Sequence, residues 1–312
     1  MNGFTITHSG ILTTLQDAGR IAWQHLGISR CGPMDWHAAA WANRLVGNEA
    51  TSPLLEVTIG GLQLTAQTDS WVAITGADVR IELDGEQQNG WSRFFVQKGQ
   101  HLKLGYARAG QRLYMAVPHG FQAESILNSV ATQSREKLGG LHRDGSALKK
   151  GDVLNCTGDL TSFCTRATVP PRYIPNFKES TMTLNVLLGG DAAQFQTTAL
   201  DAFFAQAWKI GKHSNRMGIR LQGNSITPPK RQWSLGVSPG TIQVPPDGNP
   251  IILAADCQSM GGYPILGWLC PLSLYRLSQC QAGQQVNFKA DTLDTIQARM
   301  QRFQRFFNLH CC

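Results

Sequence analysis

The sequence predicts a mainly β chain made of two barrel-like domains, with few short helices and one C-terminal helix. Glycine is abundant, at 32 of 312 residues, and charged residues make up only 16%, against about 25% in an average globular protein. Short apolar runs separated by Gly or Asp turns recur along the chain. Tight turns are rich in glycine, and long surface helices are rich in charged residues. This composition therefore favours many short strands.

The first half contains a single predicted helix. It should run from about Met34 to Val46, since Pro33 suits the first turn and Asp35 complements the positive N-terminal end of the helix dipole. Gly47 is a natural residue to end it. We therefore expect one helix within an otherwise β-rich first domain.

Strand follows strand from residue 54 to residue 117, and Asp84-Gly85 between two of them predicts a hairpin. A short internal echo supports two related β domains, because a turn glycine, a polar residue and an apolar strand recur in both halves. The three copies begin at Lys98-Gly99, Lys150-Gly151 and Ala282-Gly283.

A proline-containing linker is predicted between the two domains. Pro170-Pro171 and Pro175 disfavour regular structure there. We expect a first domain at residues 1–160, a linker at 161–182 and a second domain at 183–312.

Two helical segments are expected in the second domain. Asp191 is a candidate cap for the first, and Asp291 or Thr292 for the C-terminal helix. The apolar stripe of that last helix would consist of Ile296, Met300, Phe303 and Phe307.

The segment 236–264 is the most informative part of the chain. Residues 241–244 alternate like a half-buried strand, and Pro245-Pro246-Asp247-Gly248 is a turn in which proline fixes φ and glycine accepts positive φ. An apolar strand from Pro250 to Ala255 then ends at Asp256. A carboxylate at the end of a buried strand, followed by a glycine turn at 261–264, predicts the wall of an active site.

Bulk properties exclude several classes of protein. The net charge of +7 is scattered and Lys149-Lys150 is the only Lys-Lys pair, so no nucleic-acid partner is expected. The eight cysteines form no C-x-x-C pair, which favours reduced thiols. With neither a secretion signal nor an apolar run of about 20 residues, we expect a cytoplasmic protein with no membrane contact.

Familiar cofactor motifs are missing from the sequence. It has no Walker-type phosphate loop, no G-x-G-x-x-G opening a βαβ unit and no Met-Lys-Met sequence that would carry biotin. His8, His25, His37 and His119 lack metal-ligand spacing, so no metal site is expected. The sequence therefore shows no segment for binding ATP, and biotin is not expected.

The chain resembles the allophanate hydrolase subunit 2 family, which includes the C subunit of 5-oxoprolinase and the carboxyltransferase portion of urea carboxylase. The resemblance spans nearly the whole chain in order. It rests on the segments 14–20 (TLQDAGR), 31–35 (CGPMD), 42–48 (ANRLVGN), 55–58 (LEVT), 74–77 (ITGA), 214–223 (SNRMGIRLQG) and 236–264.

The resemblance implies two tandem cyclophilin-like β-barrel domains and a role in an ATP-dependent 5-oxoprolinase. That complex opens 5-oxo-L-proline to L-glutamate and contains the A and B subunits of the family as partners. The lactam is unstrained and resonance-stabilised, so it must be activated, for example by phosphorylation of its oxygen. Such a site needs cations, a carboxylate that positions or deprotonates water, and donors for the developing oxyanion. The chain alone is expected to be inactive.

The candidate catalytic residues are Asp256, Arg216 and Arg220. The two arginines share one side of a strand or of a helix, because their separation suits both, and pairing with a structural acid remains the alternative. The candidate substrate-binding residues are Asn215, Gln258, Ser259, Tyr263, Asp17, Arg20 and Asp35.

One departure from the family pattern bears on substrate choice. Two threonines usually precede the Gly-Gly-Tyr-Pro turn, whereas this chain has Ser259 and Met260. Ile265-Leu266-Gly267 also replaces a run that more often contains arginine. Three alternatives remain: half of a urea carboxyltransferase, a regulator that binds a partner subunit, and, on fold alone, a prolyl isomerase.

Overall fold

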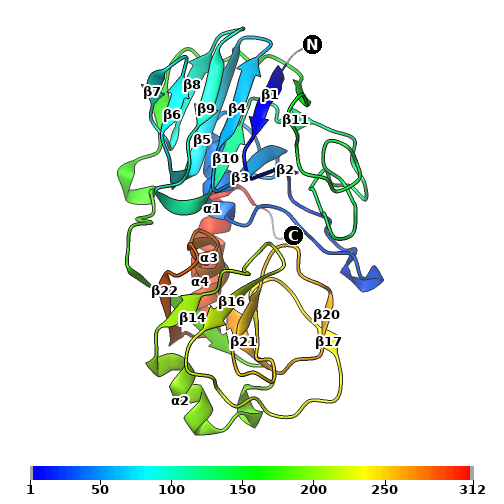
Figure 1. The fold of residues 1–312 in the computed structure, drawn as a ribbon, viewed down its shortest axis with the longest axis vertical. Coiled ribbons are helices and arrows are strands. Elements are labelled where there is room, and N and C mark those ends of the chain that lie inside the picture. The colour runs from blue at the N-terminus through cyan, green and yellow to red at the C-terminus, as the bar shows by residue number, and fades with distance from the viewer. Residues whose placement is uncertain (1–2, 310–312) are drawn as a thin grey trace. The chain divides into compact units, whose positions relative to one another are not determined.

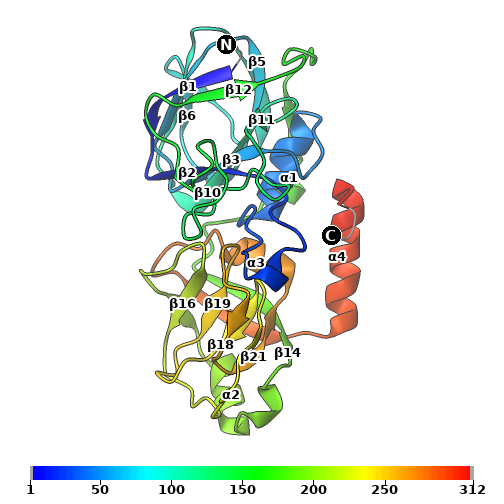
Figure 2. The same cartoon turned by 90° about the vertical axis from the view of Figure 1, so that its right-hand side faces the viewer.

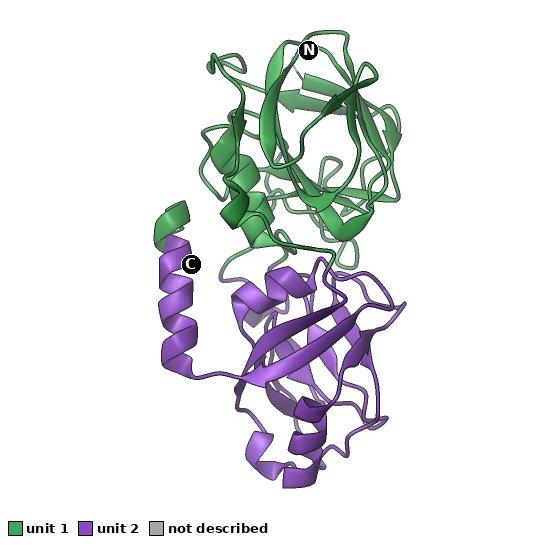
Figure 3. Ribbon diagram, turned by 90° about the vertical axis from the view of Figure 1, so that its left-hand side faces the viewer, with its two compact units in different colours: residues 1–21, 31–178, 305–312 green, residues 22–30, 179–304 purple. Residues whose placement is uncertain are grey.

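The computed structural model describes residues 3–309. Strands dominate the chain (Figure 1), which confirms the predicted mainly β class. Two compact units are present (Figure 3): the first comprises residues 1–21, 31–178 and 305–312, and the second residues 22–30 and 179–304.

The first unit contains thirteen strands in two antiparallel sheets. The strands are β1 (Gly3–Ser9), β2 (Leu12–Gln16), β3 (Leu54–Thr58), β4 (Leu62–Ala66), β5 (Ser70–Asp78), β6 (Ile81–Leu83), β7 (Glu86–Gln88), β8 (Ser92–Val96), β9 (His101–Leu104), β10 (Ala109–Ala116), β11 (Phe121–Gln122), β12 (Val153–Cys156) and β13 (Ala167–Thr168). One sheet has the order β11-β12-β1-β4-β9-β6-β7 and the other β13-β8-β5-β10-β3-β2.

Both sheets of the first unit contribute to one apolar core, which includes Phe4, Leu64, Val72 and Leu113. Burial alternates along β4 and β8, so every second side chain faces that core. The sequence predicted a barrel here, whereas the strands form two sheets. The edge strands β7, β11 and β13 have only two or three residues, too few for a ladder that would join the sheets.

The helix of the first unit is α1 (Trp36–Leu45), which begins two residues later than predicted. Asp35 is its N-cap: the backbone there is extended, and Oδ1 accepts a hydrogen bond from Ala38 N at 3.1 Å. Thr75 Oγ1 on β5 donates to Ala38 O at 2.7 Å and fixes the helix to the sheet. A short 3₁₀ turn, η2 (Pro171–Tyr173), lies in the predicted linker.

The predicted turns are confirmed. Asp84 and Gly85 both have positive φ, at 48° and 88°, and connect β6 to β7 as a two-residue hairpin. The echo glycines Gly99, Gly151 and Gly283 also share one conformation, with φ of 88°, 92° and 92°, and each precedes a strand.

The second unit is a closed barrel, as predicted. Its barrel strands are β14 (Thr181–Leu188), β15 (Trp208–Ile210), β16 (Gly218–Gln222), β18 (Thr241–Gln243), β19 (Ile251–Leu253), β21 (Ile265–Leu269) and β22 (Gln285–Ala290). They close in the order β14-β21-β18-β19-β16-β15-β22, and β14 pairs with β22 in parallel. Two short strands, β17 (Leu235–Gly236) and β20 (Met260–Gly261), form a separate ribbon.

Helices α2 (Thr197–Ala205) and α3 (Pro271–Leu277) pack on this barrel, and α2 lies at one end of it (Figure 2). Phe203 of α2 stacks on Phe288 of β22 with ring centroids 4.7 Å apart. Two 3₁₀ turns complete the unit, η1 (Gln24–Leu26) and η3 (Ala192–Gln194).

Asp191 does not cap a helix with its side chain, contrary to prediction. Its carboxylate contacts Arg231 and the backbone N–H of Ile265 instead. Arg231 lies on a distant loop and Ile265 at the start of β21, and nothing in the local sequence identifies them.

The last helix, α4, spans Leu293–Phe307. Thr292 Oγ1 accepts a hydrogen bond from Thr295 N, which confirms Thr292 as one of the two predicted caps. Ile296, Phe303 and Phe307 of the predicted stripe are buried. In the described part of the chain, none of the helices combines the length and the apolar character that crossing a membrane requires.

Candidate functional site

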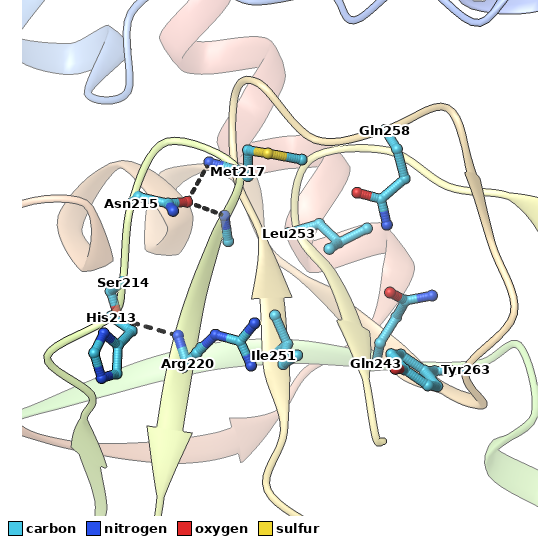
Figure 4. A pocket seen from close by; sticks show the side chains of 11 residues that line it. His213, Ser214, Asn215, Met217, Arg220, Gln243, Ile251, Leu253, Gln258 and Tyr263 are labelled. Carbon is cyan, nitrogen blue, oxygen red and sulfur yellow. Dashed lines mark hydrogen bonds between the residues drawn. The ribbon is translucent and has the colours of Figure 1, made fainter. Parts of the chain in front are cut away.

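The second unit contains a pocket of about 600 Å³. Strands β16, β18 and β19, the loop before β16 and the segment after Asp256 form its wall (Figure 4). This volume suits a small organic ligand. The polar side chains that line it include His213, Asn215, Arg220, Gln243, Gln258 and Tyr263.

The strand register places three lining residues in a row. Arg220 on β16 is directly opposite Ile251 on β19, and Ile251 is opposite Gln243 on β18. Side chains at directly opposed positions project from the same face of a sheet. Arg220 and Gln243 therefore flank Ile251 on one side of the barrel wall (Figure 4).

The guanidinium group of Arg220 is the main charge in the pocket. Within residues 3–309 it makes no hydrogen bond or ion pair; the backbone of Arg220 is engaged, since its N–H donates to Ser214 Oγ at 3.0 Å and its carbonyl accepts from Gly211 N at 2.7 Å. The side chain extends from a regular strand and the residue is exposed, so all of its donors remain available. Such a group can bind a carboxylate or phosphate in bidentate geometry.

Gln243 offers a second available donor. The residue is only 2% exposed, yet its Nε2 has no hydrogen-bond partner in the described residues. Gly261 lies against this amide, and a Cβ added there would clash with Nε2. A buried, unpartnered amide group costs on the order of 1–3 kcal/mol, which a ligand carbonyl in the pocket would offset.

Gln258 and Tyr263 complete the polar wall opposite Arg220 (Figure 4). Tyr263 is 45% exposed, and neither side chain makes a hydrogen bond within residues 3–309. Both are therefore able to contact a ligand without breaking an existing bond.

Asn215 lines the pocket but its carboxamide oxygen is already used. Oδ1 accepts hydrogen bonds from Met217 N at 2.8 Å and Gly218 N at 3.3 Å, so it shapes the turn that leads into β16. This is ordinary turn chemistry of an asparagine, so the carboxamide oxygen is not available to a ligand.

Asp256 and Arg216 form a buried bidentate ion pair. Asp256 Oδ2 accepts from Arg216 Nε at 2.8 Å and Oδ1 accepts from Nη2 at 2.7 Å, while both side chains are 9% exposed. Neither residue is among those that line the pocket. The pair connects the segment after β19 to the turn before β16, so it lies behind the pocket wall. The structure thus brings Asp256 to one of the two predicted arginines and not to the other.

The remaining predicted residues lie away from the pocket lining. Ser259 is half-buried beside the β17–β20 ribbon, where its carbonyl accepts from Val237 N. In the first unit, Asp17 accepts from Ser129 Oγ and Val130 N, and Arg20 Nη2 donates to Ala131 O at 2.8 Å.

Those two first-unit side chains, with the helix cap Asp35, fasten loops within their own unit. Arg20 and Asp35 are at most 2% exposed. Asp17, Arg20 and Asp35 thus stabilise loops and the start of a helix. The residues that line the pocket belong to the second unit.

Sequence reasoning missed Gln243 and His213. The stretch from Thr241 to Val244 reads as an alternating strand with one polar face, but all four residues are buried. The burial of both faces of this strand comes from the assembled barrel, so the sequence carried no signal for Gln243. His213 gave no signal, because the loop that carries it has no regular pattern.

The cysteine next to the ion pair is not a nucleophile at neutral pH. Burial, and then the negative charge of Asp256, raise the pKa of the Cys257 thiol to about 12. The thiol stays protonated and packs in a small apolar cluster with Val237, Leu253 and Ile265.

Comparison with known proteins gives consistent results. The carboxyltransferase domain, subdomain A and B, matches residues 26–290. The chain is 35% identical over 305 residues to the C subunit of 5-oxoprolinase from Escherichia coli (strain K12), covering 97% of this chain and 96% of that protein. It is 29% identical over 306 residues to urea amidolyase of Saccharomyces cerevisiae, covering 91% of this chain but only 16% of the yeast protein.

A solved structure agrees with the sequence matches. K. lactis urea amidolyase superposes with a TM-score of 0.89 at 26% identity, over 98% of this chain and 20% of that one. The chain belongs to the carboxyltransferase domain family, subdomains A and B. Within that family it is homologous both to the 5-oxoprolinase C subunit and to a segment of urea amidolyase, which confirms the resemblance stated from the motifs.

Proposed function

We propose that this chain is the subunit of an ATP-dependent 5-oxoprolinase that binds 5-oxo-L-proline in the pocket of the second unit. The observation that carries the proposal is the pairing of an unengaged guanidinium with an unpartnered buried amide in one small pocket. The bacterial relative named as the C subunit of 5-oxoprolinase matches along nearly its whole length, which supports the same conclusion.

The chemistry of the substrate fits these two groups. 5-Oxo-L-proline carries one carboxylate and one lactam, and Arg220 would bind the carboxylate in bidentate geometry. Gln243 Nε2 would donate to the lactam oxygen, where negative charge develops as water attacks. The pocket of about 600 Å³ is larger than this ligand, so it also accommodates a phosphoryl group on the lactam oxygen.

The buried ion pair has a different role in this proposal. Asp256 was predicted as the acid–base residue, but both of its oxygens accept hydrogen bonds from Arg216. A carboxylate held in this way is a poor proton acceptor, because protonation would break a buried bidentate contact. We assign Asp256 and Arg216 to positioning the turn at Asn215.

ATP enters the proposal as a substrate of the complex, and we place its binding on the partner A and B subunits. The pocket lining offers one guanidinium and one imidazole, Arg220 and His213. A triphosphate normally needs several cations or a glycine-rich loop that presents backbone N–H groups. Biotin is not part of this proposal.

A surface near the pocket supports a partner subunit. Trp233, Leu235 and Met260 are 55%, 42% and 55% exposed on or beside the β17–β20 ribbon, and Tyr263, two residues beyond the ribbon, is also exposed. Exposed apolar side chains gathered in this way are typical of protein contact sites. On this basis the isolated chain binds substrate weakly or not at all and is inactive without its partners.

The fold of the two domains and the cellular location of the protein are also part of the proposal. We propose that residues 1–160 and 183–312 are cyclophilin-like domains joined by residues 161–182. The six cysteines in the described residues are all free, which supports a reducing, cytoplasmic location.

The second candidate is the carboxyltransferase half of a urea carboxylase, supported by the similarity to urea amidolyase. Urea is neutral and has no carboxylate, so it would leave Arg220 without its main ligand contact. This observation favours 5-oxo-L-proline. The regulator alternative, in which the chain only binds a partner, predicts that changes in the pocket leave its effect intact.

The test uses the chain together with its partner subunits. We expect ATP-dependent release of glutamate from 5-oxo-L-proline, and no ATP-dependent turnover of urea with biotin components. Arg220→Ala should lower kcat/KM by about a hundredfold, because a charged contact to the carboxylate is lost. The matched control, Arg302→Ala on the exposed face of α4, should leave kcat/KM unchanged.

Two results would contradict the proposal. Robust turnover of urea in place of 5-oxo-L-proline would support the carboxyltransferase alternative. An Arg220→Ala complex as active as the wild type would remove the pocket from the reaction and favour a regulatory role.

A further inference from the structure

We propose that Asp191 and Arg231 form a buried clamp that positions Tyr263 at the wall of the pocket and thereby sets how tightly the substrate fits. This inference rests on the proposed function for the identity of the substrate. The clamp itself is a geometric claim that can be tested separately.

The clamp is an ion pair that water does not reach. Arg231 Nη1 donates to Asp191 Oδ2 at 2.9 Å, and the two side chains are only 2% and 6% exposed. The two residues lie 40 positions apart on separate loops, so their pairing fixes those loops to one another.

Both partners also bind the backbone around Tyr263. Arg231 Nη1 donates to Tyr263 O at 3.1 Å, and Ile265 N donates to Asp191 Oδ2 at 2.8 Å. Between these two contacts, Val244 N donates to Pro264 O at 2.9 Å. Asp191 N also donates to Ile265 O at 2.8 Å. Three consecutive residues are thus held by these four hydrogen bonds, and the clamp side chains make two of them.

The side chain of Tyr263 has no comparable support of its own. It is 45% exposed and makes no hydrogen bond in the described part of the chain. Its location at the pocket therefore depends on its backbone, which the clamp and Val244 hold. Arg231 and Asp191 do not line the pocket, so they are positioning residues and do not contact the substrate.

Burying this cation is costly, which suggests a role beyond stability. Arg231 Nε and Nη2 are buried without a hydrogen-bond partner among the described residues. A buried ion pair is often no better for stability than apolar residues of the same volume, and unpartnered donors make it worse. Exact placement of a pocket wall is a reason to retain such a pair.

The experiment replaces tyrosine by 3-fluorotyrosine and follows the ¹⁹F NMR spectrum of the full chain. The sequence contains five tyrosines, so five signals are expected, and Tyr263→Phe identifies the one from Tyr263. We expect Arg231→Gln to shift or broaden that signal and to leave the other four in place. Arg276→Gln, which removes an exposed ion pair with Glu179 in the same unit, is the matched control and should leave the Tyr263 signal unchanged.

Activity of the assembled complex supplies the second readout. Arg231→Gln should raise KM for 5-oxo-L-proline about tenfold and change kcat by less than about threefold, because a displaced wall weakens fit without removing a reacting group. Arg231→Lys keeps the charge but loses the forked geometry, so it should restore only part of the fit.

A variant that fails to fold is replaced by Asp191→Leu together with Arg231→Met. This double change fills the same space with apolar groups and still removes both side-chain hydrogen bonds to the backbone of residues 263 and 265. The same shift of the Tyr263 signal is expected from it.

Each outcome is decisive. An unchanged Tyr263 signal in these variants would overturn the clamp. A shifted signal with an unchanged KM would overturn its role in substrate fit. A shifted signal, alongside a wild-type complex that does not turn over 5-oxo-L-proline, would support the clamp and reject the proposed function.

Discussion

Two groups of polar side chains, one in each unit, differ in how far the protein satisfies their hydrogen bonds. In the first unit, Glu56 Oε2 accepts from Tyr114 Oη and from Met34 N, both at 2.8 Å, and all of these residues are buried. In the second unit, Arg220 and Gln243 face a pocket and have no side-chain partner in residues 3–309. Buried groups that are satisfied by protein stabilise a fold, whereas fixed groups left unsatisfied are available to a ligand.

The same network in the first unit explains why Tyr114 does not act as an acid at neutral pH. Burial raises the pKa of Tyr114 well above its usual value, and the nearby carboxylates of Glu56 and Asp35 raise it further. The Tyr114 hydroxyl in turn accepts from Asp35 N at 2.8 Å, which links the strand to the start of α1. This cluster holds α1 on the sheet, so its role is structural.

Breaking the ion pair behind the pocket should give the largest effect. Asp256→Asn leaves the guanidinium of Arg216 buried and only partly paired, so we expect the free energy of unfolding to fall by about 3–5 kcal/mol. Denaturant unfolding measures it. In the assembled complex, KM should rise while the pH–rate profile keeps its shape, since Asp256 positions the wall. Loss of the acidic limb of that profile, with normal stability, would restore Asp256 as the acid–base residue.

Weakening the first-unit network should give a smaller effect with a different signature. Glu56→Gln keeps the shape but loses a charged acceptor for two hydrogen bonds and the buried ion pair with Arg112 Nε at 3.8 Å, so the free energy of unfolding should fall by about 2–3 kcal/mol. KM and kcat of the assembled complex should stay near wild type at temperatures well below the melting point. A large change in KM would mean that the two polar clusters are energetically coupled.

The smallest expected effect is a pH dependence in the first unit. Burial lowers the pKa of His37 to about 4 from 6.5, and its ring packs near Trp91 and Phe307. Between these values the unfolded chain binds more protons, so stability falls as the pH falls from about 6.5 to about 4. Because the side chain is only partly buried, we expect a loss of about 1–2 kcal/mol.

Thermal unfolding across that pH range measures the effect. The control, His37→Phe, keeps an aromatic ring and removes the titration, so it should flatten this part of the pH profile. An equally steep profile in the control would assign the acid sensitivity to other groups.

Local patterns in the sequence were enough to predict much of the fold. The hairpin at Asp84-Gly85, the echo glycines, the cap at Thr292 and the strands on either side of residues 245–248 each depend on neighbouring residues alone. The two sheets of the first unit were not predictable in the same way, because sheet closure depends on pairings between residues far apart in sequence.

The same limit applies to the site. Arg220 and Tyr263 were predicted and line the pocket, whereas Asp256 turns back to Arg216 because β19 ends at Leu253 and irregular backbone follows. Gln243 was missed because both faces of its strand are buried. Two properties depend on the assembled barrel: the direction of a side chain beyond the end of its strand, and whether the second face of a strand is buried. A local sequence pattern shows neither.

The parallel pairing of β14 with β22 has a consequence for how the chain is made. These two strands lie about a hundred positions apart, and six residue pairs join them along their length. The barrel cannot close until residue 290 has emerged from the ribosome. Until then the apolar strands of the second unit are exposed. During this period a molecular chaperone would protect them from aggregation.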